Sequence, residues 1–265
     1  MPELPEVETV SRNIAPYIKN KTISGCAVYW QKTVEQPTAT EFAERIANQT
    51  VLRVGRRAKY IVIDLSKDSL LIHLRMSGDL LFSPSPQAPR SHDRVTLQFT
   101  DGSELAFNDP RKFGRVWLVS DPTSVTGKLG PEPLGEDFNL GIFKSIIDQR
   151  DRNIKAFLLD QTMIAGMGNI YTDEALYLAG ILPTRKTSTL TPSEASLLYN
   201  AIRSVLNEGI RQNGASFDWV YRGGHFQNNF NVYKRAKLPC KGCGTQIIKI
   251  TLQQRGTHYC PNCQK

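Results

Sequence analysis

The stretch KYIVIDLSKDSLLIHL (59–74) decides the fold of the first half of the chain. It contains two runs of β-branched and large apolar residues, 59–65 and 69–74, separated by a short polar turn. Asp101-Gly102 lies between two later runs and is a strong hairpin signal. Those later runs are RVTLQF (94–99), ELAF (104–107) and RVWLV (115–119). Short strands separated by turn signals predict a β-sandwich or a barrel here.

Helices are expected on both sides of these strands. Residues 5–19 show apolar side chains at helical spacing, and Pro5 suits a first helical turn. A loop-rich segment, 127–138, separates the strands from a helical second half. Its expected helices are FKSIIDQR (143–150), IKAFLLDQ (154–161), NIYTDEALYLAG (169–180) and SEASLLYNAIRSVLNEGI (193–210). The sequence therefore predicts an α+β multidomain protein, with an N-terminal β-sandwich that carries an N-terminal helix.

Cysteine spacing predicts a metal site at the end of the chain. Four of the five cysteines form the pattern C-x2-C-x16-C-x2-C, and they are Cys240, Cys243, Cys260 and Cys263. Four thiolates complete a tetrahedral zinc shell, so we expect one structural ion with no open position for catalysis. Two disulfides are the alternative, and the absence of a signal peptide argues against them. Cys26 is left over and is expected to act as a small buried apolar residue.

The distribution of charge indicates a polyanionic partner. The net charge is +8, and the eight lysines and arginines after Asp218 have no acidic residue among them. A segment of one sign suggests nucleic acid, although a solvated basic tail is an equally good explanation of charge alone. No apolar run is long enough to cross a membrane, and MPELPEVETV (1–10) is not a signal peptide. We therefore expect a cytoplasmic protein with no membrane partner.

The first residues offer an unusual nucleophile. Removal of Met1 would leave Pro2 with a free secondary amine, whose pKa near 8 keeps much of it neutral at pH 7. A neutral amine attacks an aldehydic carbon and forms an iminium. Glu3 and Glu6 would lie close by, where carboxyl groups suit proton transfer. Taken alone, Pro5 and the acids are better explained as residues that favour a helix N-terminus.

Motifs along nearly the whole chain change that balance. The chain resembles the formamidopyrimidine-DNA glycosylase family, and the order and spacing of the shared motifs fit. The matching stretches are PELPEVETV (2–10), RRAKY (56–60), HLRMSG (73–78), HDRV (92–95), DPRKFG (109–114), LGPEPL (129–134), IK (154–155), AGMGNIY (165–171), FQNNFNVYKR (226–235) and QRGTHYC (254–260).

The resemblance implies a role for each catalytic candidate. Pro2 would attack C1′ of the damaged nucleotide, and Glu3 would be the acid that opens the sugar or protonates the leaving group. Glu6 would support the amine by hydrogen bonding. Lys59 matches the lysine linked to proton transfer during β-elimination. Arg255 matches the arginine of phosphate contact and δ-elimination, and since arginine keeps its proton we favour electrostatic stabilisation.

The resemblance also implies DNA contacts. Base flipping leaves a gap in the duplex, and the family fills it with a trio that matches Met76, Arg111 and Phe113. Met76 and Phe113 alone would more often be core residues. Asn169 is expected to cap a helix and contact DNA. The further backbone-binding positions are His92, Arg150 and Lys155. His73 is expected to be structural.

The expected organisation follows from these parts. Residues 2–130 would form the catalytic sandwich, 131–230 a helical domain with a helix–two-turn–helix motif, and 231–265 the four-cysteine zinc finger. The expected activity is a monomeric glycosylase and AP lyase that removes oxidised purines from double-stranded DNA and cuts at abasic sites. The alternatives are an endonuclease VIII-like enzyme for oxidised pyrimidines, a non-catalytic damage-binding protein, and a general zinc-ribbon module.

One departure from the family concerns base preference. The segment WVYRGGH (219–225) is shorter than the family pattern predicts, at the loop that covers the everted base in relatives. The choice among 8-oxoguanine, formamidopyrimidines and oxidised pyrimidines is therefore open, whereas the chemistry at the sugar is not affected.

Overall fold

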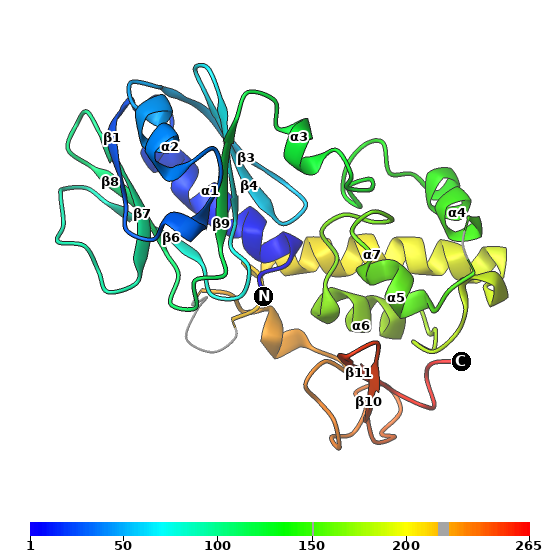
Figure 1. Ribbon diagram of the computed structural model, residues 1–265. Coiled ribbons are helices and arrows are strands. Elements are labelled where there is room, and N and C mark those ends of the chain that lie inside the picture. The colour runs from blue at the N-terminus through cyan, green and yellow to red at the C-terminus, as the bar shows by residue number, and fades with distance from the viewer. Residues whose placement is uncertain (150, 217–222) are drawn as a thin grey trace. The chain divides into compact units, whose positions relative to one another are not determined.

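Two compact units make up the computed structural model, which describes residues 1–149, 151–216 and 223–265 (Figure 1). The first unit is built on Met1–Lys128 and the second on Leu129–Ala215 and Gly224–Lys265. No helix among the described residues has both the length and the apolar character that a membrane span requires.

The first unit is a β-sandwich. One sheet has four strands in the order β1 (Ile23–Val28), β7 (Asp93–Phe99), β8 (Glu104–Asn108), β6 (Asp79–Ser83). The other has five, in the order β2 (Val34–Gln36), β9 (Arg115–Val119), β5 (Ser69–His73), β4 (Tyr60–Leu65), β3 (Val51–Arg57). Neighbouring strands are antiparallel except for the pair β2–β9. The five predicted strands are confirmed, and the Asp101-Gly102 turn joins β7 to β8.

Two helices close the open sides of this sandwich. Helix α1 (Leu4–Ile18) packs on β3 and β6, which are edge strands of different sheets. Helix α2 (Ala39–Ile46) packs on β1 and β2, the two opposite edges. The helix expected over 5–19 is confirmed within a residue at each end, whereas α2 was not predicted. Short helical turns complete the unit: η1 (Gln31–Thr33) and α3 (Thr123–Thr126).

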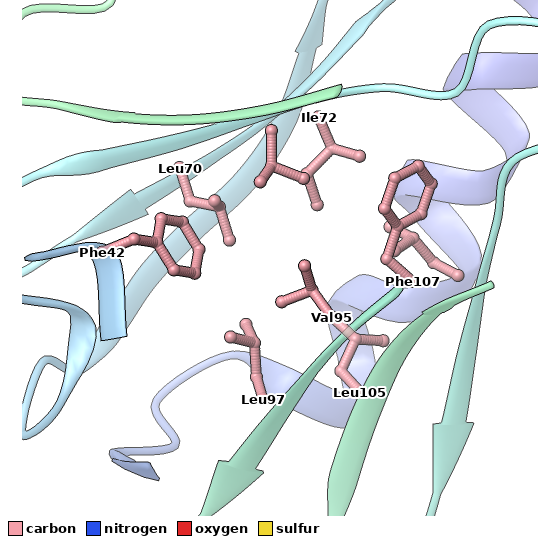
Figure 2. A pocket seen from close by; sticks show the side chains of 9 residues that line it. Phe42, Leu70, Ile72, Val95, Leu97, Leu105 and Phe107 are labelled. Carbon is pink, nitrogen blue, oxygen red and sulfur yellow. The ribbon is translucent and has the colours of Figure 1, made fainter. Parts of the chain in front are cut away.

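The sandwich core is apolar and closely packed. Side chains of both sheets, α1 and α2 form one buried cluster. A cavity of about 10 Å³ remains within it, and Figure 2 shows how the side chains of both sheets and Phe42 of α2 surround it. Its lining is Phe42, Leu70, Ile72, Leu80, Val95, Leu97, Leu105, Phe107 and Val116. A water molecule would find no hydrogen-bond partner there, so the cavity is a packing feature and not a ligand site.

The second unit is helical and ends in a β-hairpin. Its helices are α4 (Leu140–Asp148), α5 (Ile154–Leu159), α6 (Asn169–Leu178) and α7 (Pro192–Arg211), with short turns η2 (Thr187–Thr189) and η3 (Phe226–Asn229). All four predicted helices are present. Helix α7 starts with a capping box formed by Thr191 and Glu194. The hairpin consists of β10 (Ile248–Leu252) and β11 (Arg255–Tyr259), and α6 packs against β11 (Figure 1).

Candidate functional site

The N-terminus of α1 carries the predicted nucleophile and acids. The helix begins at Leu4 with Glu3 as its N-cap, so Pro2 directly precedes the first turn. The side chains of Glu3 and Glu6 are buried. Pro2 is also buried, whereas Met1 is exposed. A carboxylate oxygen of Glu6 accepts a hydrogen bond from the Glu3 N–H at 2.7 Å. Glu6 therefore holds the backbone that immediately follows Pro2.

Two polar contacts show the register of α1 on β3. The Ser11 hydroxyl donates to the Gly55 carbonyl at 2.9 Å, and Glu8 pairs with Arg56 at 3.0 Å. The N-terminus of α1 therefore lies toward the C-terminal end of β3. The tight β3–β4 turn, Ala58-Lys59, follows that end. Glu3 and the buried Lys59 thus come to the same end of the first unit.

Two loops of the first unit present the predicted gap-filling trio. Met76 and Phe113 are 44% and 47% exposed, which is unusual for large apolar side chains. The guanidinium of Arg111 lies 5.0 Å from the centre of the Phe113 ring, so the two form a cation–π pair. His92 is also exposed, just before β7. The expectation that Met76 and Phe113 would more often be core residues does not hold for this chain.

Left-handed backbone occurs beside several of the functional candidates. Non-glycine residues rarely adopt positive φ, and such strain clusters at functional sites. Four of the residues with φ between +53° and +61° adjoin a candidate: Ala58 adjoins Lys59, Arg75 adjoins Met76, Lys112 separates Arg111 from Phe113, and Gln254 precedes Arg255. Local strain therefore accompanies these four turns, and it also occurs at turns without a candidate, such as those of Asn20 and Asn48.

His73 stabilises one of these strained turns. Its Nδ1 accepts a hydrogen bond from the Arg75 N–H at 3.0 Å. Burial, followed by the positive charges of Arg75 and Lys59, lowers the pKa of His73 to about 3. The ring is therefore neutral at physiological pH and serves as an acceptor, in agreement with the structural role expected for it.

A buried ion pair holds the C-terminal hairpin on the helical unit. Lys155 of α5 is 1% exposed, and its Nζ lies 2.6 Å from an oxygen of Asp173 on α6. The same ammonium donates to the Thr257 hydroxyl at 2.8 Å and to the Gly256 carbonyl at 3.1 Å. The other Asp173 oxygen accepts from the His258 N–H at 2.9 Å. This geometry favours a positioning role for Lys155, next to Arg255, over direct contact with a phosphate.

Asn169 contributes to the same attachment. The prediction that its side chain caps α6 is wrong, because Gly168 is the N-cap and Asn169 is the first helical residue. Its side-chain amide donates instead to the Gly256 carbonyl at 2.8 Å. The preceding turn needs Gly166, whose φ is +91°. Arg255 itself is exposed at the start of β11. The carbonyl of its neighbour Gly256 accepts hydrogen bonds from Asn169 and Lys155, so the hairpin is fixed while Arg255 faces solvent.

Sequence reasoning missed several buried acids. Glu174 of α6 accepts backbone hydrogen bonds from Asn231, Val232 and Tyr233 at 2.9–3.1 Å, and so fixes the FQNNFNVYKR segment. Asp173 and Asp109 also accept backbone hydrogen bonds, from His258 and Gly114 respectively. The local pattern does not mark these acids as buried, because adjacent positions of a helix can both face solvent. Arg150 lies outside the described residues, as does most of the short 219–225 segment.

The four terminal cysteines form a cluster that fits one zinc ion. Their sulfur atoms all lie within 4.8 Å of one another. The Sγ–Sγ distances are 3.8 Å for Cys240–Cys263 and 3.5 Å for Cys243–Cys260, near the roughly 3.8 Å of a tetrahedral shell with 2.3 Å Zn–S bonds. The hydroxyl of Tyr177, on α6, lies 3.3 Å from the Cys240 sulfur. The cluster therefore anchors the finger next to α6.

Loss of one zinc ligand should empty the site and loosen the finger. Cys243→Ser is expected to reduce zinc from about one ion per chain to almost none and to remove hydrogen-exchange protection from β10–β11, because a structural ion supplies most of the folding free energy of so small a module. The control is Cys26→Ser, since burial raises the pKa of Cys26 to about 12 and it lies in the other unit. Full zinc content in Cys243→Ser would contradict the assignment.

Family models match all three parts of the chain. Residues 1–116 match the formamidopyrimidine-DNA glycosylase N-terminal domain, and 129–219 match the formamidopyrimidine-DNA glycosylase H2TH domain. Residues 237–265 match the zinc finger found in FPG and IleRS. The match of the last model and the four clustered sulfur atoms agree on one zinc ion as the cofactor.

Relatives extend the similarity to the full length. The formamidopyrimidine-DNA glycosylase of Pelotomaculum thermopropionicum is 43% identical, over 100% of this chain and 99% of its own. That of Chloroflexus aggregans is 44% identical, over 100% and 98%.

Solved structures show the same fold. Lactococcus lactis Fpg in complex with DNA that contains an abasic site has a TM-score of 0.92 at 35% identity, over 99% of both chains. The wild-type Lactococcus lactis enzyme with N7-benzyl-Fapy-dG DNA has a TM-score of 0.93 at 36% identity, over 100% of both. The predicted α+β architecture is thereby confirmed, and the chain belongs to the formamidopyrimidine-DNA glycosylase family.

Proposed function

We propose that this protein is a bifunctional DNA glycosylase and AP lyase that removes oxidised purines from double-stranded DNA. The observation that carries the proposal is that Pro2 precedes a buried Glu3 at the N-terminus of α1, in a chain that matches a formamidopyrimidine-DNA glycosylase over 99% of that relative's length. The complexes of the Lactococcus lactis relative with abasic-site and Fapy-dG DNA support this substrate class.

The chemistry begins at the amine of Pro2 after Met1 has been removed. Its lone pair attacks C1′ of the flipped nucleotide, the glycosidic bond breaks, and the base leaves with the proton that the Pro2 nitrogen gives up. Glu3 protonates O4′ as the sugar ring opens, which gives the iminium between Pro2 and C1′. The Glu3 carboxyl is buried and directly follows Pro2 in the chain, which suits it to this step.

Strand cleavage follows from the iminium. Loss of a C2′ proton expels the 3′ phosphate by β-elimination, and Lys59, at the same end of the unit as Glu3, is the proposed group for that proton transfer. Arg255 stabilises the phosphate that leaves in δ-elimination. Its guanidinium is exposed on a fixed hairpin, and this suits it to bind a phosphate group. Glu6 keeps the backbone after Pro2 in place.

Binding is proposed to depend on the phosphates and on the gap left by the flipped base. Met76, Arg111 and Phe113 enter that gap, and Arg111 hydrogen-bonds the orphaned cytosine. His92, Asn169 and Arg150 are the proposed phosphate contacts, while Lys155 acts through the Arg255 hairpin. Since phosphate contacts carry no sequence code, binding should be largely sequence-independent and should weaken with salt.

The proposed organisation keeps the three segments 2–130, 131–230 and 231–265 as sandwich, helical domain and zinc finger. We further propose that the protein acts as a monomer in the bacterial cytoplasm. The relatives that match over the full length are bacterial.

Cleavage of a lesion panel tests the proposal. Single-turnover rates on duplexes with 8-oxoguanine or a formamidopyrimidine opposite cytosine should exceed those on a thymine-glycol duplex by at least about tenfold. The products should carry phosphates at both ends of the gap, as β,δ-elimination requires. A preference for thymine glycol would instead indicate an endonuclease VIII-like enzyme, and binding without cleavage of any lesion would indicate a damage-binding protein.

A further inference from the structure

Asp109 lies at the junction of the two loops that carry the gap-filling trio. It follows β8 directly and is 0% exposed. One carboxylate oxygen accepts from the Ser77 hydroxyl in a short hydrogen bond, and from the Arg111 N–H at 3.2 Å. The other accepts from the Gly114 N–H at 2.7 Å. One buried carboxylate therefore joins the Met76 turn to both ends of the Arg111–Phe113 loop.

The backbone of Asp109 extends the network to a third functional position. Its N–H donates to the carbonyl of His92 at 2.9 Å. Its carbonyl accepts from the buried guanidinium of Arg94 at 2.7 Å and from the Lys112 N–H at 3.3 Å, which closes the turn from Asp109 to the left-handed Lys112. His92 is the proposed phosphate contact on this face, so its position is tied to the same residue.

The ring of Phe107 provides an apolar base beneath the same two loops. A Cβ at Gly78 would lie 2.7 Å from an atom of this ring, and a Cβ at Gly114 would overlap it. Both loops therefore rest on one buried side chain, which Figure 2 shows at the border of the core cavity. Because a core of this density does not deform continuously, the loops have little freedom to move separately.

We propose that Asp109 is a positioning residue that locks Met76, Arg111 and Phe113 into one rigid wedge, which enters the duplex as a unit. The three side chains come from two loops that are far apart in the chain, and the Asp109 carboxylate bonds to both. This inference rests on the proposed function. It predicts that loss of Asp109 impairs base eversion in a duplex, while the amine chemistry at Pro2 remains intact.

Two variants test the proposal. Asp109→Asn places an amide NH2 where an oxygen now accepts hydrogen bonds. Ser77→Ala removes the hydroxyl that donates to Asp109 and also accepts from the Arg111 N–H at 3.2 Å, so it cuts the Met76 turn off from the network. The matched control is Asp68→Asn, which changes another carboxylate of the sandwich that accepts side-chain hydrogen bonds, from Arg45 and Gln49. A thermal melt of each variant beside the full-length wild-type protein establishes how much of it is folded.

Each variant is measured in two reactions. The first is single-turnover excision of 8-oxoguanine from a duplex with 2-aminopurine next to the lesion, whose fluorescence reports unstacking. The second is borohydride trapping on a single-stranded oligonucleotide with a preformed abasic site, which needs no wedge. We expect Asp109→Asn to lose about 100-fold in excision and most of the fluorescence rise, Ser77→Ala to lose about tenfold, and trapping to stay within about twofold of wild type. Asp68→Asn should match the wild type in both reactions.

The outcomes separate this inference from the proposed function. Wild-type protein that neither excises nor traps would refute the proposed function itself. An active wild type with Asp109→Asn and Ser77→Ala at wild-type excision rates would overturn the wedge. Equal losses in excision and trapping by a folded variant would also overturn it, since they would show a general effect on the site. If Asp109→Asn does not fold, the Ser77→Ala result decides in the same way.

Discussion

A protein that keeps Met1, or carries a tag before it, should bind lesion DNA and fail to cut it. An amide nitrogen at Pro2 has no basic lone pair, so it cannot attack C1′ or form an iminium. The expected loss in the single-turnover cleavage rate is about 10⁴-fold or more, as for removal of a covalent nucleophile. Affinity for a duplex with an uncleavable abasic-site analogue should change by less than about threefold.

The matched comparison is Pro2→Gly. Glycine also permits removal of Met1 and keeps a free α-amine, so this variant should retain measurable cleavage and trapping, whereas the tagged protein should show neither. Mass spectrometry must verify each N-terminus. Full cleavage by a protein that verifiably keeps Met1 or its tag, and whose Pro2 nitrogen is therefore an amide, would exclude Pro2 as the nucleophile.

Glu3→Gln should produce the second-largest loss. The amide cannot give or take a proton at the reacting sugar, so excision of 8-oxoguanine should fall about 10²–10⁴-fold. Cleavage of a preformed abasic site should fall less, because there the sugar is already partly open and no base has to leave. The ratio of the two rates, measured in single turnover, therefore separates loss of the acid from a general loss of activity.

Glu8→Gln is the control on the same helix. Glu8 lies on the face of α1 that meets Arg56, and its ion pairs with Arg12 and Arg56 are partly exposed. Such pairs contribute about 1 kcal/mol or less to stability. Glu8→Gln should therefore excise and cleave at nearly the wild-type rates. Equal rate losses in both variants would mean that any change of charge on α1 disturbs the site, and would remove the argument for Glu3.

Local patterns were sufficient for most of the elements. Strands β4, β5, β7, β8 and β9 and the helices over 143–210 were predicted because their apolar periodicity is strong, whereas β6 was not predicted. Helix α2 was missed, although Thr38, Glu41 and the spacing of Phe42 and Ile46 mark it. It is short, and its stability comes from closing the edges of the sandwich, which is a tertiary effect.

In the candidate site too, residues with a local sequence pattern were predicted, and contacts that depend on tertiary packing were not. Cysteine spacing identified the cluster because four thiolates at this spacing have few other uses. The surroundings of Lys155 and Asn169 could not be predicted, because Asp173 becomes a neighbour of Lys155 only when α5 packs on α6, and Gly256 only when the hairpin docks. Asp109 was missed for the same reason. A motif such as DPRKFG draws attention to its exposed residues first, and the buried acid that holds them is identified only from the contacts.

Peptide mapping of the borohydride-trapped complex tests the central claim most directly. The processed protein is incubated with an 8-oxoguanine duplex, reduced during the reaction, digested, and analysed by tandem mass spectrometry. We predict one nucleotide adduct on the nitrogen of Pro2, in a peptide that lacks Met1. An adduct on Lys59 or another amine, with Pro2 unmodified, would contradict the account.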